Sequence, residues 1–256
     1  MIELKSADEI KRMRQAGRVV AALLRHLEGL VKPGLQTKAF DEASLEFLKQ
    51  HGAHPAFLGY RGFPATVCVS VNEEVVHGIP GQRRLERGDL VSLDAGAVVE
   101  GWYADAATSV TVGPASLLAQ RLLETTRKAL HAGIEQAVVG HRLSDISHAV
   151  QKTIEQERFG IVRDFVGHGI GRALHEDPPV PNFGAPNTGP RLQAGMTLAI
   201  EPMVTAGGFA VEVLQDGWTA VTKDHSLAAH FEHTIVVTEA GPEILTQQEM
   251  GVVAKA

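Results

Sequence analysis

Residues 90–112 read LVSLDAGAVVEGWYADAATSVTV, and this stretch predicts two strands of a β-hairpin joined near residues 99–101. Asp94 and Asp105 stand in these apolar strands, where an unpaired charge is costly. If the hairpin turns symmetrically over residues 98–101, Asp94 faces Asp105. Facing side chains lie about 4.5–5.5 Å apart at their β-carbons. Two like charges at that distance require either a shared proton or bridging cations.

A different register, for instance one with a bulge, would instead leave both acids in solvent at the strand edge. For an arbitrary pair of acids that arrangement is the more usual one. Three further residues favour a cation: His168 lies between glycines, Glu201 ends an apolar run, and Glu232 begins another. Singly, His168 could be a turn histidine and each acid could be salt-bridged. Jointly, four acids without an adjoining Lys or Arg indicate two divalent ions, which would balance their charge.

Composition narrows the class of protein. With 256 residues, 44% of them hydrophobic, the chain can build a large core, and one or two domains are both expected at this length. A net charge of −6 disfavours general binding to nucleic acid or to anionic membranes. The single cysteine, Cys68, cannot form an internal disulfide, which fits a reducing compartment. Because no signal peptide or membrane-length apolar run is visible, we expect a soluble, cytoplasmic protein.

The order of elements suggests two similar halves around a shared sheet. Ser6 and Glu9 form a capping-box pattern that opens a helix ending near residues 32–34. Thr37 is expected to cap a second helix that reaches Lys49 and carries Phe40, Leu45 and Leu48 inward. Further predictions are a strand at 66–71, a turn at 77–81, a helix at 116–138, a helix that Ser144 opens and that ends near 158, and short strands from 165 onward. No residue-level repeat and no low-complexity linker are visible, so one domain is expected.

Ordered motifs run through the whole chain. Asp94 and Asp105 are followed by Gly-His168-Gly-Ile-Gly-Arg-x-x-His175, by Ile-Glu201-Pro and by Glu232-His-Thr-Ile-Val-Val-Thr. Other segments of the same pattern are FLGYRGFPATVCVSVN at 57–72, VVHGIP at 75–80 and DGW at 216–218. In these motifs the chain resembles a type I methionine aminopeptidase. Five ligand positions in order, with matching contexts, form a specific signal that no single one provides.

The resemblance implies a fold and a metal centre. The fold would be the α/β pita-bread (creatinase/aminopeptidase) arrangement, two pseudo-symmetric halves around a curved, mostly antiparallel sheet. Residues 1–256 would form a single metallopeptidase catalytic domain of bacterial type, without an amino-terminal extension. Two divalent ions, cobalt, manganese, iron or zinc, would be bridged by Asp105 and Glu232 and completed by Asp94, His168 and Glu201. A monovalent cation is implied near Asn72.

The same resemblance assigns further residues. Glu201 would be the proton shuttle, His175 a donor to the substrate carbonyl oxygen, and His77 a neighbour of the scissile peptide. Without the resemblance, His77 reads as an ordinary turn histidine. The implied walls of an apolar substrate pocket are Tyr60, Phe63, Cys68, His77, Leu174, His175 and Trp218. The chain departs from the usual bacterial pattern at Phe57, where cysteine is common, at Phe63, where tyrosine is common, and at Leu174, where an aromatic is common, so the preference of the pocket stays open.

The implied activity is hydrolytic removal of the N-terminal methionine from nascent proteins and peptides with a small second residue. The implied enzyme is a monomer with transient ribosome association and no specific nucleic-acid or membrane partner. Two rival interpretations share the fold. A prolidase or Xaa-Pro aminopeptidase would share the metal ligands but usually carries an extra amino-terminal domain. A metal-free binding protein would not need all five ligands and both histidines.

Overall fold

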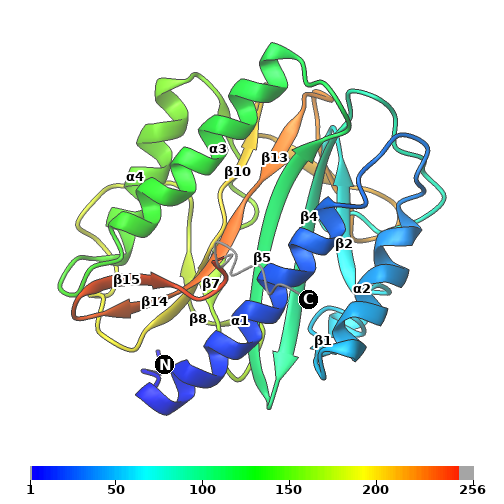
Figure 1. The fold of residues 1–256 in the computed structure, drawn as a ribbon. Coiled ribbons are helices and arrows are strands. Elements are labelled where there is room, and N and C mark those ends of the chain that lie inside the picture. The colour runs from blue at the N-terminus through cyan, green and yellow to red at the C-terminus, as the bar shows by residue number, and fades with distance from the viewer. Residues whose placement is uncertain (1, 248–256) are drawn as a thin grey trace.

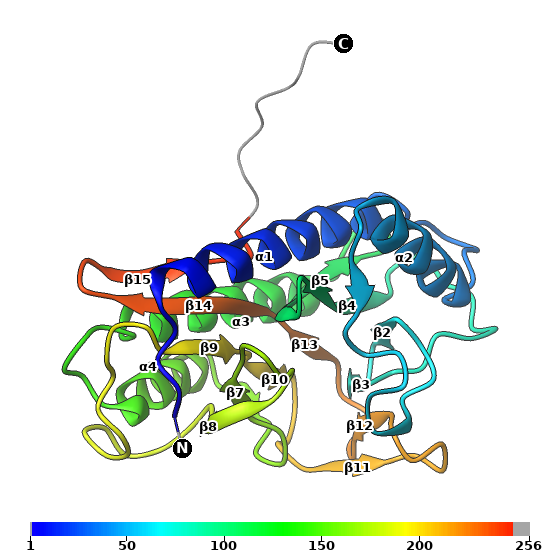
Figure 2. The ribbon, with the colours of Figure 1, turned by 90° about the horizontal axis from the view of Figure 1, so that it is seen from below.

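The computed structural model describes residues 2–247. Figure 1 shows two pairs of helices in front of a curved sheet, α1 and α2 over one half and α3 and α4 over the other. Figure 2 shows the strands β7, β8 and β11 on the side of the molecule away from α1 and α2. The helix bounds are Ala7–Glu28 for α1, Lys38–Gln50 for α2, Leu117–Glu135 for α3 and Leu143–Gln156 for α4. A short 3₁₀ helix spans Tyr60–Gly62.

The main sheet has nine strands in the order β1-β4-β5-β14-β9-β7-β8, with β2 paired to β4 and β15 paired to β14. Each of these pairings is antiparallel. The curved antiparallel sheet that the resemblance implied is therefore confirmed. The strand bounds are His54–Pro55 for β1, Val67–Val71 for β2, Leu90–Val99 for β4, Trp102–Thr111 for β5, Gly167–Gly169 for β7, Glu176–Val180 for β8, Thr197–Ile200 for β9, Glu232–Thr238 for β14 and Gly241–Ile244 for β15.

The described residues also form two three-stranded sheets, whose strand orders are β13-β10-β6 and β11-β12-β3. Their strands are Glu74–Val76 for β3, Gly160–Ile161 for β6, Met203–Thr205 for β10, Val211–Val213 for β11, Ala220–Thr222 for β12 and Ala228–His230 for β13. Strand β13 ends only two residues before β14 begins, so the chain passes from a small sheet directly into the centre of the main one.

The hydrophobic core sits between the helices and one face of the main sheet. Successive strand residues point to opposite faces. Ala95 and Ala97 of β4 and Ala104 and Ala106 of β5 belong to the cluster that packs under α1 and α2. Asp94 and Asp105 have the opposite parity, so both point away from these helices. A second cluster of buried side chains joins α3 and α4 to β9 and β14.

The predicted hairpin forms, but its predicted register is wrong by two residues. Asp105 pairs with Gly96, and Asp94 pairs with Ala107. The reason is a tight two-residue turn, in which Glu100 and Gly101 have φ of 51° and 79° between the last paired residues of the two strands. A shift of two residues does not change the face on which a side chain lies. Asp94 and Asp105 are therefore diagonal neighbours on one face, about 7–8 Å apart by general strand geometry.

The four predicted helices form, but the first ends at Glu28, before its predicted end near residues 32–34, and three further local predictions about the helices are wrong. Ser6 and Glu9 do form a capping box, and Ser116 caps α3. Thr37 makes no side-chain cap, because its backbone is already helical and its hydroxyl accepts from the Gly81 N–H instead. Leu45 is 49% exposed, because the buried stripe of α2 follows Phe40, Ser44 and Leu48. Helix α4 starts at Leu143 after Arg142, not at Ser144, whose hydroxyl donates to the Thr188 carbonyl.

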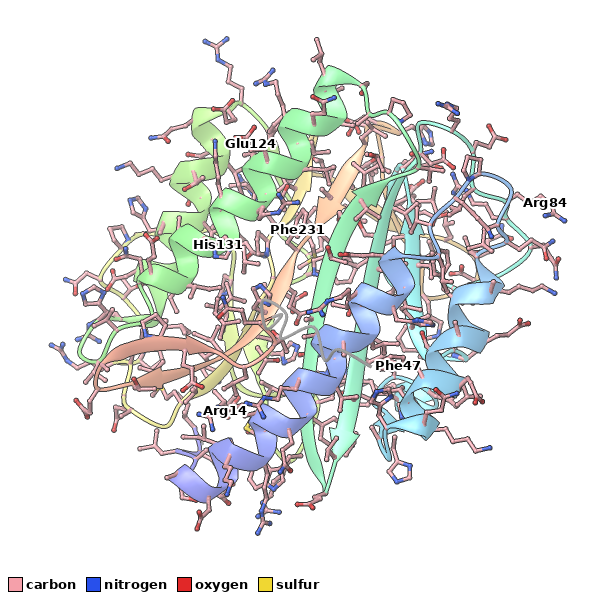
Figure 3. All side chains as sticks on the ribbon, in the orientation of Figure 1. Arg14, Phe47, Arg84, Glu124, His131 and Phe231 are labelled. Carbon is pink, nitrogen blue, oxygen red and sulfur yellow. The ribbon has the colours of Figure 1, made fainter. Side chains whose placement is uncertain are left out.

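One ion pair on the outer surface links helix α1 to strand β15. Arg14, which projects from α1 in Figure 3, forms an ion pair of 2.8 Å with Glu243 of β15. This contact joins the first helix to the last strand of the described chain. Among residues 2–247, no helix combines the length and the apolar composition that crossing a lipid bilayer requires.

Candidate metal centre

Five adjacent strands bring the predicted ligands to one place. In the order β4-β5-β14-β9-β7, Asp94, Asp105, Glu232 and His168 lie on β4, β5, β14 and β7, and Glu201 follows the last residue of β9. Each strand thus contributes one side chain to the same part of the sheet. The acids lie on the face away from the helices, so they meet across a space that the helical cores do not fill.

Glycines allow His168 to enter this space. A β-carbon at Gly167 would lie 2.4 Å from the Ala199 carbonyl oxygen, and one at Gly169 would lie 2.2 Å from the Asp177 carbonyl oxygen. Both distances are shorter than van der Waals contact, so only glycine lets β8 and β9 approach β7 this closely. The Gly-His-Gly sequence is therefore required by strand packing, and it leaves the imidazole as the one side chain of β7.

The ligand atoms form a compact buried cluster. Atoms of Asp105, His168 and Glu232 all lie within 4.8 Å of one another. The Nε2 of His168 is 3.6 Å from Asp105 Oδ2 and 3.6 Å from Glu201 Oε1. Its Nδ1 lies 2.9 Å from the Gly169 carbonyl oxygen, which can only accept, so the proton belongs on Nδ1 and the Nε2 lone pair is free. This is the tautomer that binds a metal.

Asp105 is held in place by a neighbouring strand. The hydroxyl of Thr234 on β14 donates to the Asp105 carbonyl oxygen at 2.8 Å and accepts from the Asp105 N–H at 3.1 Å. It also lies 3.3 Å from Asp105 Oδ1. The carboxylate therefore has little freedom to turn away from the cluster.

The electrostatics of the cluster are unfavourable without cations. Burial raises the pKa of Asp94 and of Glu201 to about 8, and the charge of Asp105 adds to the shift in both. Burial and the other acids raise the pKa of Glu232 well above its ordinary value. Burial also raises the pKa of Asp105, against the opposing effect of His168.

Two buried polar atoms at the cluster have no hydrogen-bond partner in the described chain, Asp94 Oδ1 and His230 Nε2. Buried polar atoms are normally paired, so such atoms need an explanation. Two buried and two half-buried carboxylates with an imidazole are a donor set suited to divalent transition metals. The residues present therefore fit a metal centre, in which a cation would supply the positive charge that the protein lacks here.

The cluster forms the floor of a cavity of about 170 Å³. Every side chain that the sequence analysis named as a metal ligand, a catalytic group or a substrate wall lines it, together with Phe57 and Arg61. The walls are mostly apolar: Phe63 meets Trp218 edge to face at 5.2 Å, and Leu174 is 3% exposed. Cys68 is also buried, and burial raises the pKa of its thiol well above the ordinary value, so this thiol is a neutral wall group.

Two further histidines face the cavity as neutral imidazoles. The Nδ1 of His175 lies 2.8 Å from the Tyr60 hydroxyl, and its ring lies 4.1 Å from that of His168. Although the His175 ring reaches solvent, desolvation and the electrostatic effect of the neighbouring His168 lower its pKa to about 3. Desolvation lowers the pKa of His77 to about 4, and its ring stands edge-on to Trp218.

Asn72 lies away from this cavity, and its polar groups have partners. Its side chain donates to Asp89 at 2.9 Å and accepts from the Leu90 N–H at 2.9 Å. Its carbonyl oxygen accepts from the Ala228 N–H. Binding of a monovalent cation near Asn72 stays a prediction.

The sequence analysis missed two residues at the site. Arg61 lines the mouth of the cavity, 5.4 Å from the Tyr60 ring centre. His230 is 2% exposed, and its Nε2 lies 3.4 Å from Glu201 Oε2. The signal for His230 was its position two residues before Glu232.

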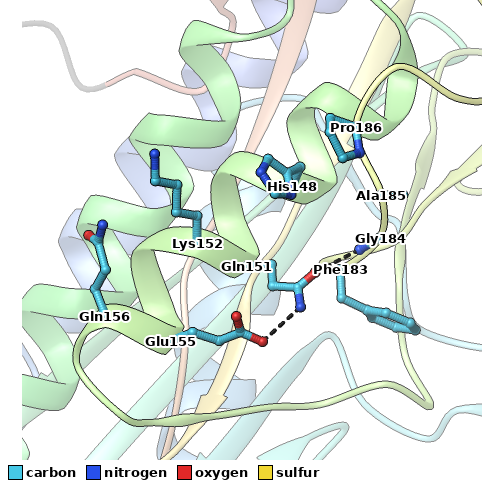
Figure 4. A pocket seen from close by; sticks show the side chains of 9 residues that line it. All are labelled: His148, Gln151, Lys152, Glu155, Gln156, Phe183, Gly184, Ala185 and Pro186. Atoms are coloured by element: carbon cyan, nitrogen blue, oxygen red, sulfur yellow. Dashed lines mark hydrogen bonds between the residues drawn. The ribbon is translucent and has the colours of Figure 1, made fainter.

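A larger and more open pocket of about 700 Å³ lies elsewhere, between α4 and residues 183–186 (Figure 4). Gln151 accepts there from the Gly184 N–H and donates to Glu155. Among the described residues that line this pocket, Glu155 is the one acid and His148 the one histidine. The smaller cavity, where four acids and His168 meet, is therefore the candidate functional site.

Comparison with known proteins agrees with this geometry. Residues 11–239 match metallopeptidase family M24. Methionine aminopeptidase 1 of Bacillus subtilis is 51% identical over 247 residues, which cover 96% of this chain and 100% of that protein. The crystal structure of a methionine aminopeptidase from Thermotoga maritima, 48% identical, superposes with a TM-score of 0.95 over 97% of this chain and 100% of that one.

A prolidase from Pyrococcus furiosus is also similar, with a TM-score of 0.78. It is 22% identical, and the match covers 96% of this chain but 66% of the prolidase, so it shows the shared fold alone. The resemblance to type I methionine aminopeptidases is confirmed at far higher identity and over full length. From its sequence match and its fold, the chain belongs to metallopeptidase family M24.

Proposed function

We propose that this chain is a metal-dependent methionine aminopeptidase that removes the N-terminal methionine from peptides and nascent proteins. The observation that carries the proposal is the position of the five potential ligands: five neighbouring strands each deliver one of them to the floor of a cavity with mostly apolar walls. The full-length relatives of about 50% identity bear the name of this activity. A buried acidic floor beside an apolar wall suits a peptide with an apolar first side chain.

The proposed centre holds two divalent ions. Asp94, Asp105, His168, Glu201 and Glu232 would hold them, with Asp105 and Glu232 shared between the two ions as the resemblance implies. Four carboxylates then balance the charge of two dications. When bound, such ions polarise the scissile carbonyl and make water acidic enough to supply hydroxide near neutral pH. Oxygen-rich ligands of this kind accept manganese, iron, cobalt or zinc, and availability in the cell decides among them.

The protein's own groups divide the remaining work. Glu201 lies at the cluster with 13% of its side chain exposed, so it can reach both the ions and the cavity. We assign it the transfer of a proton from the attacking water to the leaving amine. The Tyr60 hydroxyl lies 2.8 Å from Nδ1 of His175, and we assign it as the donor in this contact, which places the His175 proton on Nε2. That N–H is then the donor to the substrate carbonyl oxygen as negative charge develops on it.

The cavity walls would set the specificity. Tyr60, Phe63, Cys68, Leu174 and Trp218 would surround the unbranched thioether side chain of methionine, which adapts well to aromatic and apolar surfaces. His77 would lie beside the scissile peptide. A small second residue is the preference implied by the family. Phe57 also lines this cavity, at a position where the usual bacterial pattern has cysteine.

We extend the proposal to the setting in which the enzyme acts. Nascent chains in the cytoplasm are the natural source of N-terminal methionine, which brings the enzyme into transient contact with ribosomes. The single cysteine and the net charge of −6 support a reducing compartment and the absence of a general nucleic-acid or membrane partner. We also propose a monomer with one catalytic domain, since the ligands come from both halves of one continuous sheet.

The test joins metal content to product release. Purified protein should carry about two equivalents of transition metal by elemental analysis and release methionine from Met-Ala-Ser faster than from Met-Lys-Ser. Dialysis against a chelator should abolish release, and manganese or cobalt should restore it. An Ala-Pro dipeptide, the substrate type of a prolidase, serves as the control and should stay intact. Metal-free protein with chelator-resistant turnover would contradict the proposal, as would preferential cleavage before proline.

A further inference from the structure

His230 is a buried histidine for which the proposed mechanism has no use. It ends strand β13 and is 2% exposed. The hydroxyl of Ser109 holds the His230 backbone in place. It donates to the His230 carbonyl oxygen at 2.7 Å and accepts from the His230 backbone N–H at 3.0 Å. The backbone that carries the ring is therefore held by the sheet and does not belong to a loop.

The ring of His230 faces the acid cluster. Its Nε2 is 3.4 Å from Glu201 Oε2, while the Nε2 of His168 is 3.6 Å from the other oxygen, Oε1. The Glu201 carboxylate thus has one imidazole beside each of its oxygens. The charges of Asp94 and Asp105 also act on His230.

An ordinary core histidine would have its ring nitrogens paired within the protein. The Nε2 of His230 has no hydrogen-bond partner in the described chain, so a purely structural role leaves this atom unexplained. The ion pair recorded for this nitrogen in the described chain is with Glu201, at 3.4 Å, and not with the compact group of Asp105, His168 and Glu232. What remains within reach of the nitrogen is the Glu201 carboxylate.

We propose that His230 is a positioning residue, whose Nε2–H holds Glu201 by Oε2 and thereby keeps Oε1 directed toward His168 and the metal centre. This inference rests on the proposed function, because it assigns an orienting partner to the proton shuttle. Hydrogen bonds of catalytic groups are often long in the free protein and shorten when the complex forms.

The register of the small sheet explains why this contact exists. Strand β13 pairs with β10 so that His230 stands opposite Met203, two residues after Glu201. The pairing brings the end of one strand beside the residue that follows β9, although 29 positions separate Glu201 and His230 in the sequence. The contact therefore depends on tertiary pairing.

The experiment compares His230→Gln with His230→Met. The two replacement side chains have similar length and shape, but only glutamine supplies an N–H donor. In the cobalt-loaded protein, His230→Met should lower kcat by about 10- to 100-fold with KM for Met-Ala-Ser within about twofold, as expected for loss of a group that orients a ligand. It should also alter the visible absorption spectrum of the bound cobalt. His230→Gln should restore both toward the wild-type values.

His233→Met is the matched control. His233 lies three residues further along, bonds to Thr246 and neighbours His131 of α3, which Figure 3 shows on the helix side of the sheet. It should leave the cobalt spectrum and the kcat unchanged even if it lowers stability. Circular dichroism and thermal unfolding establish that each variant is folded, and should His230→Met not fold, His230→Leu takes its place.

Several outcomes would overturn the inference. Equal loss in His230→Gln and His230→Met would assign the residue to packing alone. Wild-type kcat and cobalt spectrum in a folded His230→Met would show that Glu201 needs no such partner. In either case a wild-type protein that binds metal and releases methionine leaves the proposed function standing. A wild-type protein without metal and without methionine release would overturn both.

Discussion

For single residues, the proposed chemistry depends on side chains whose conformations are restricted by their neighbours. Asp105 is 3% exposed, and the Thr234 hydroxyl contacts its backbone and one carboxylate oxygen. A buried carboxylate held in this way remains beside three other acids even though their charges repel. Such an arrangement lowers stability locally and prepares the protein to bind a cation.

Asp105→Asn should abolish metal binding and turnover, because the amide is neutral and the bridging ligand is lost. The chelated variant should be at least as stable as the chelated parent, since a buried acid with a raised pKa is replaced by a neutral group. Elemental analysis, the methionine-release assay and thermal unfolding measure these effects. Glu243→Gln, which removes an acid on β15 outside the site, is the control and should retain metal and activity. Normal metal content in Asp105→Asn would contradict the assignment.

His175→Ala should keep both metal ions and lose about 10²-fold or more in kcat, as removal of an oxyanion donor does. The expectation follows from the neutral state of the ring, which the lowered pKa indicates, and from the Tyr60 contact that directs its proton. Steady-state kinetics on Met-Ala-Ser, with metal content as the control, tests it. Full activity in the variant would remove His175 from the mechanism.

Asp224, which does not line the cavity, makes a pH-dependent contribution to the stability of the folded protein. Its carboxylate accepts from the Gly208 N–H at 2.6 Å and from the Ser226 N–H at 3.1 Å, and these bonds lower its pKa to about 2. Because the folded pKa lies below the ordinary value of about 3.9, the contribution is complete above pH 4. It is lost as the pH falls from about 4 toward 2.

Asp224→Asn should therefore flatten this part of the stability profile. The carboxylate is exposed, so we expect a difference below about 1 kcal/mol. Urea unfolding of the chelated parent and the variant between pH 5 and pH 2 measures it. Parallel profiles for the two proteins would show that Asp224 contributes nothing.

At the scale of elements, the β4–β5 hairpin determines where two of the acids lie. Glu100 and Gly101 both have positive φ, the geometry of the two-residue turn that matches strand twist. This turn moves the register by two residues from the symmetric expectation and keeps both acids on the same face. The sequence identified the hairpin and the face, but the length of the turn decided the pairing.

The turn itself is testable by a pair of substitutions. Gly101→Ala should reduce the free energy of unfolding by about 1–2 kcal/mol, the cost of a left-handed backbone for a residue with a β-carbon. Glu100→Asn should increase it by about 0.5 kcal/mol, because Asn-Gly is the favoured sequence for this turn. Urea unfolding measures both. The two substitutions should change the free energy of unfolding in opposite directions. An increase in Gly101→Ala would contradict the turn geometry.

At the scale of the whole molecule, the metal centre joins the two halves of the sheet. Asp94 and Asp105 come from strands under α1 and α2, whereas Glu201 and His168 come from the half that α3 and α4 cover. Glu232 lies on β14, between them. Bound ions would therefore hold the halves together and stabilise the folded state over the unfolded one.

Metal removal should lower the melting temperature of the whole protein. An ion present at about 100 times its dissociation constant stabilises by about 2.7 kcal/mol, which corresponds to a shift of about 5–10 °C for a protein of this size. Thermal unfolding with chelator and with added manganese measures the shift. Asp105→Asn is the control, because manganese should not raise its melting temperature. An equal shift in that variant would mean that the stabilising ion binds elsewhere.

By itself, the sequence predicted the four helices, the strands that carry the candidate ligands, and the acids and His168 that lie together in the cavity. These predictions rested on local patterns, namely the capping box at Ser6, the apolar runs around the acids and the glycines around His168, and on the resemblance to a known family. The tertiary structure alone decided the hairpin register, the exposure of Leu45 and the contact of His230 with Glu201. Each of these depends on which residues face one another across segments distant in the chain, and local sequence patterns carry no information about that pairing.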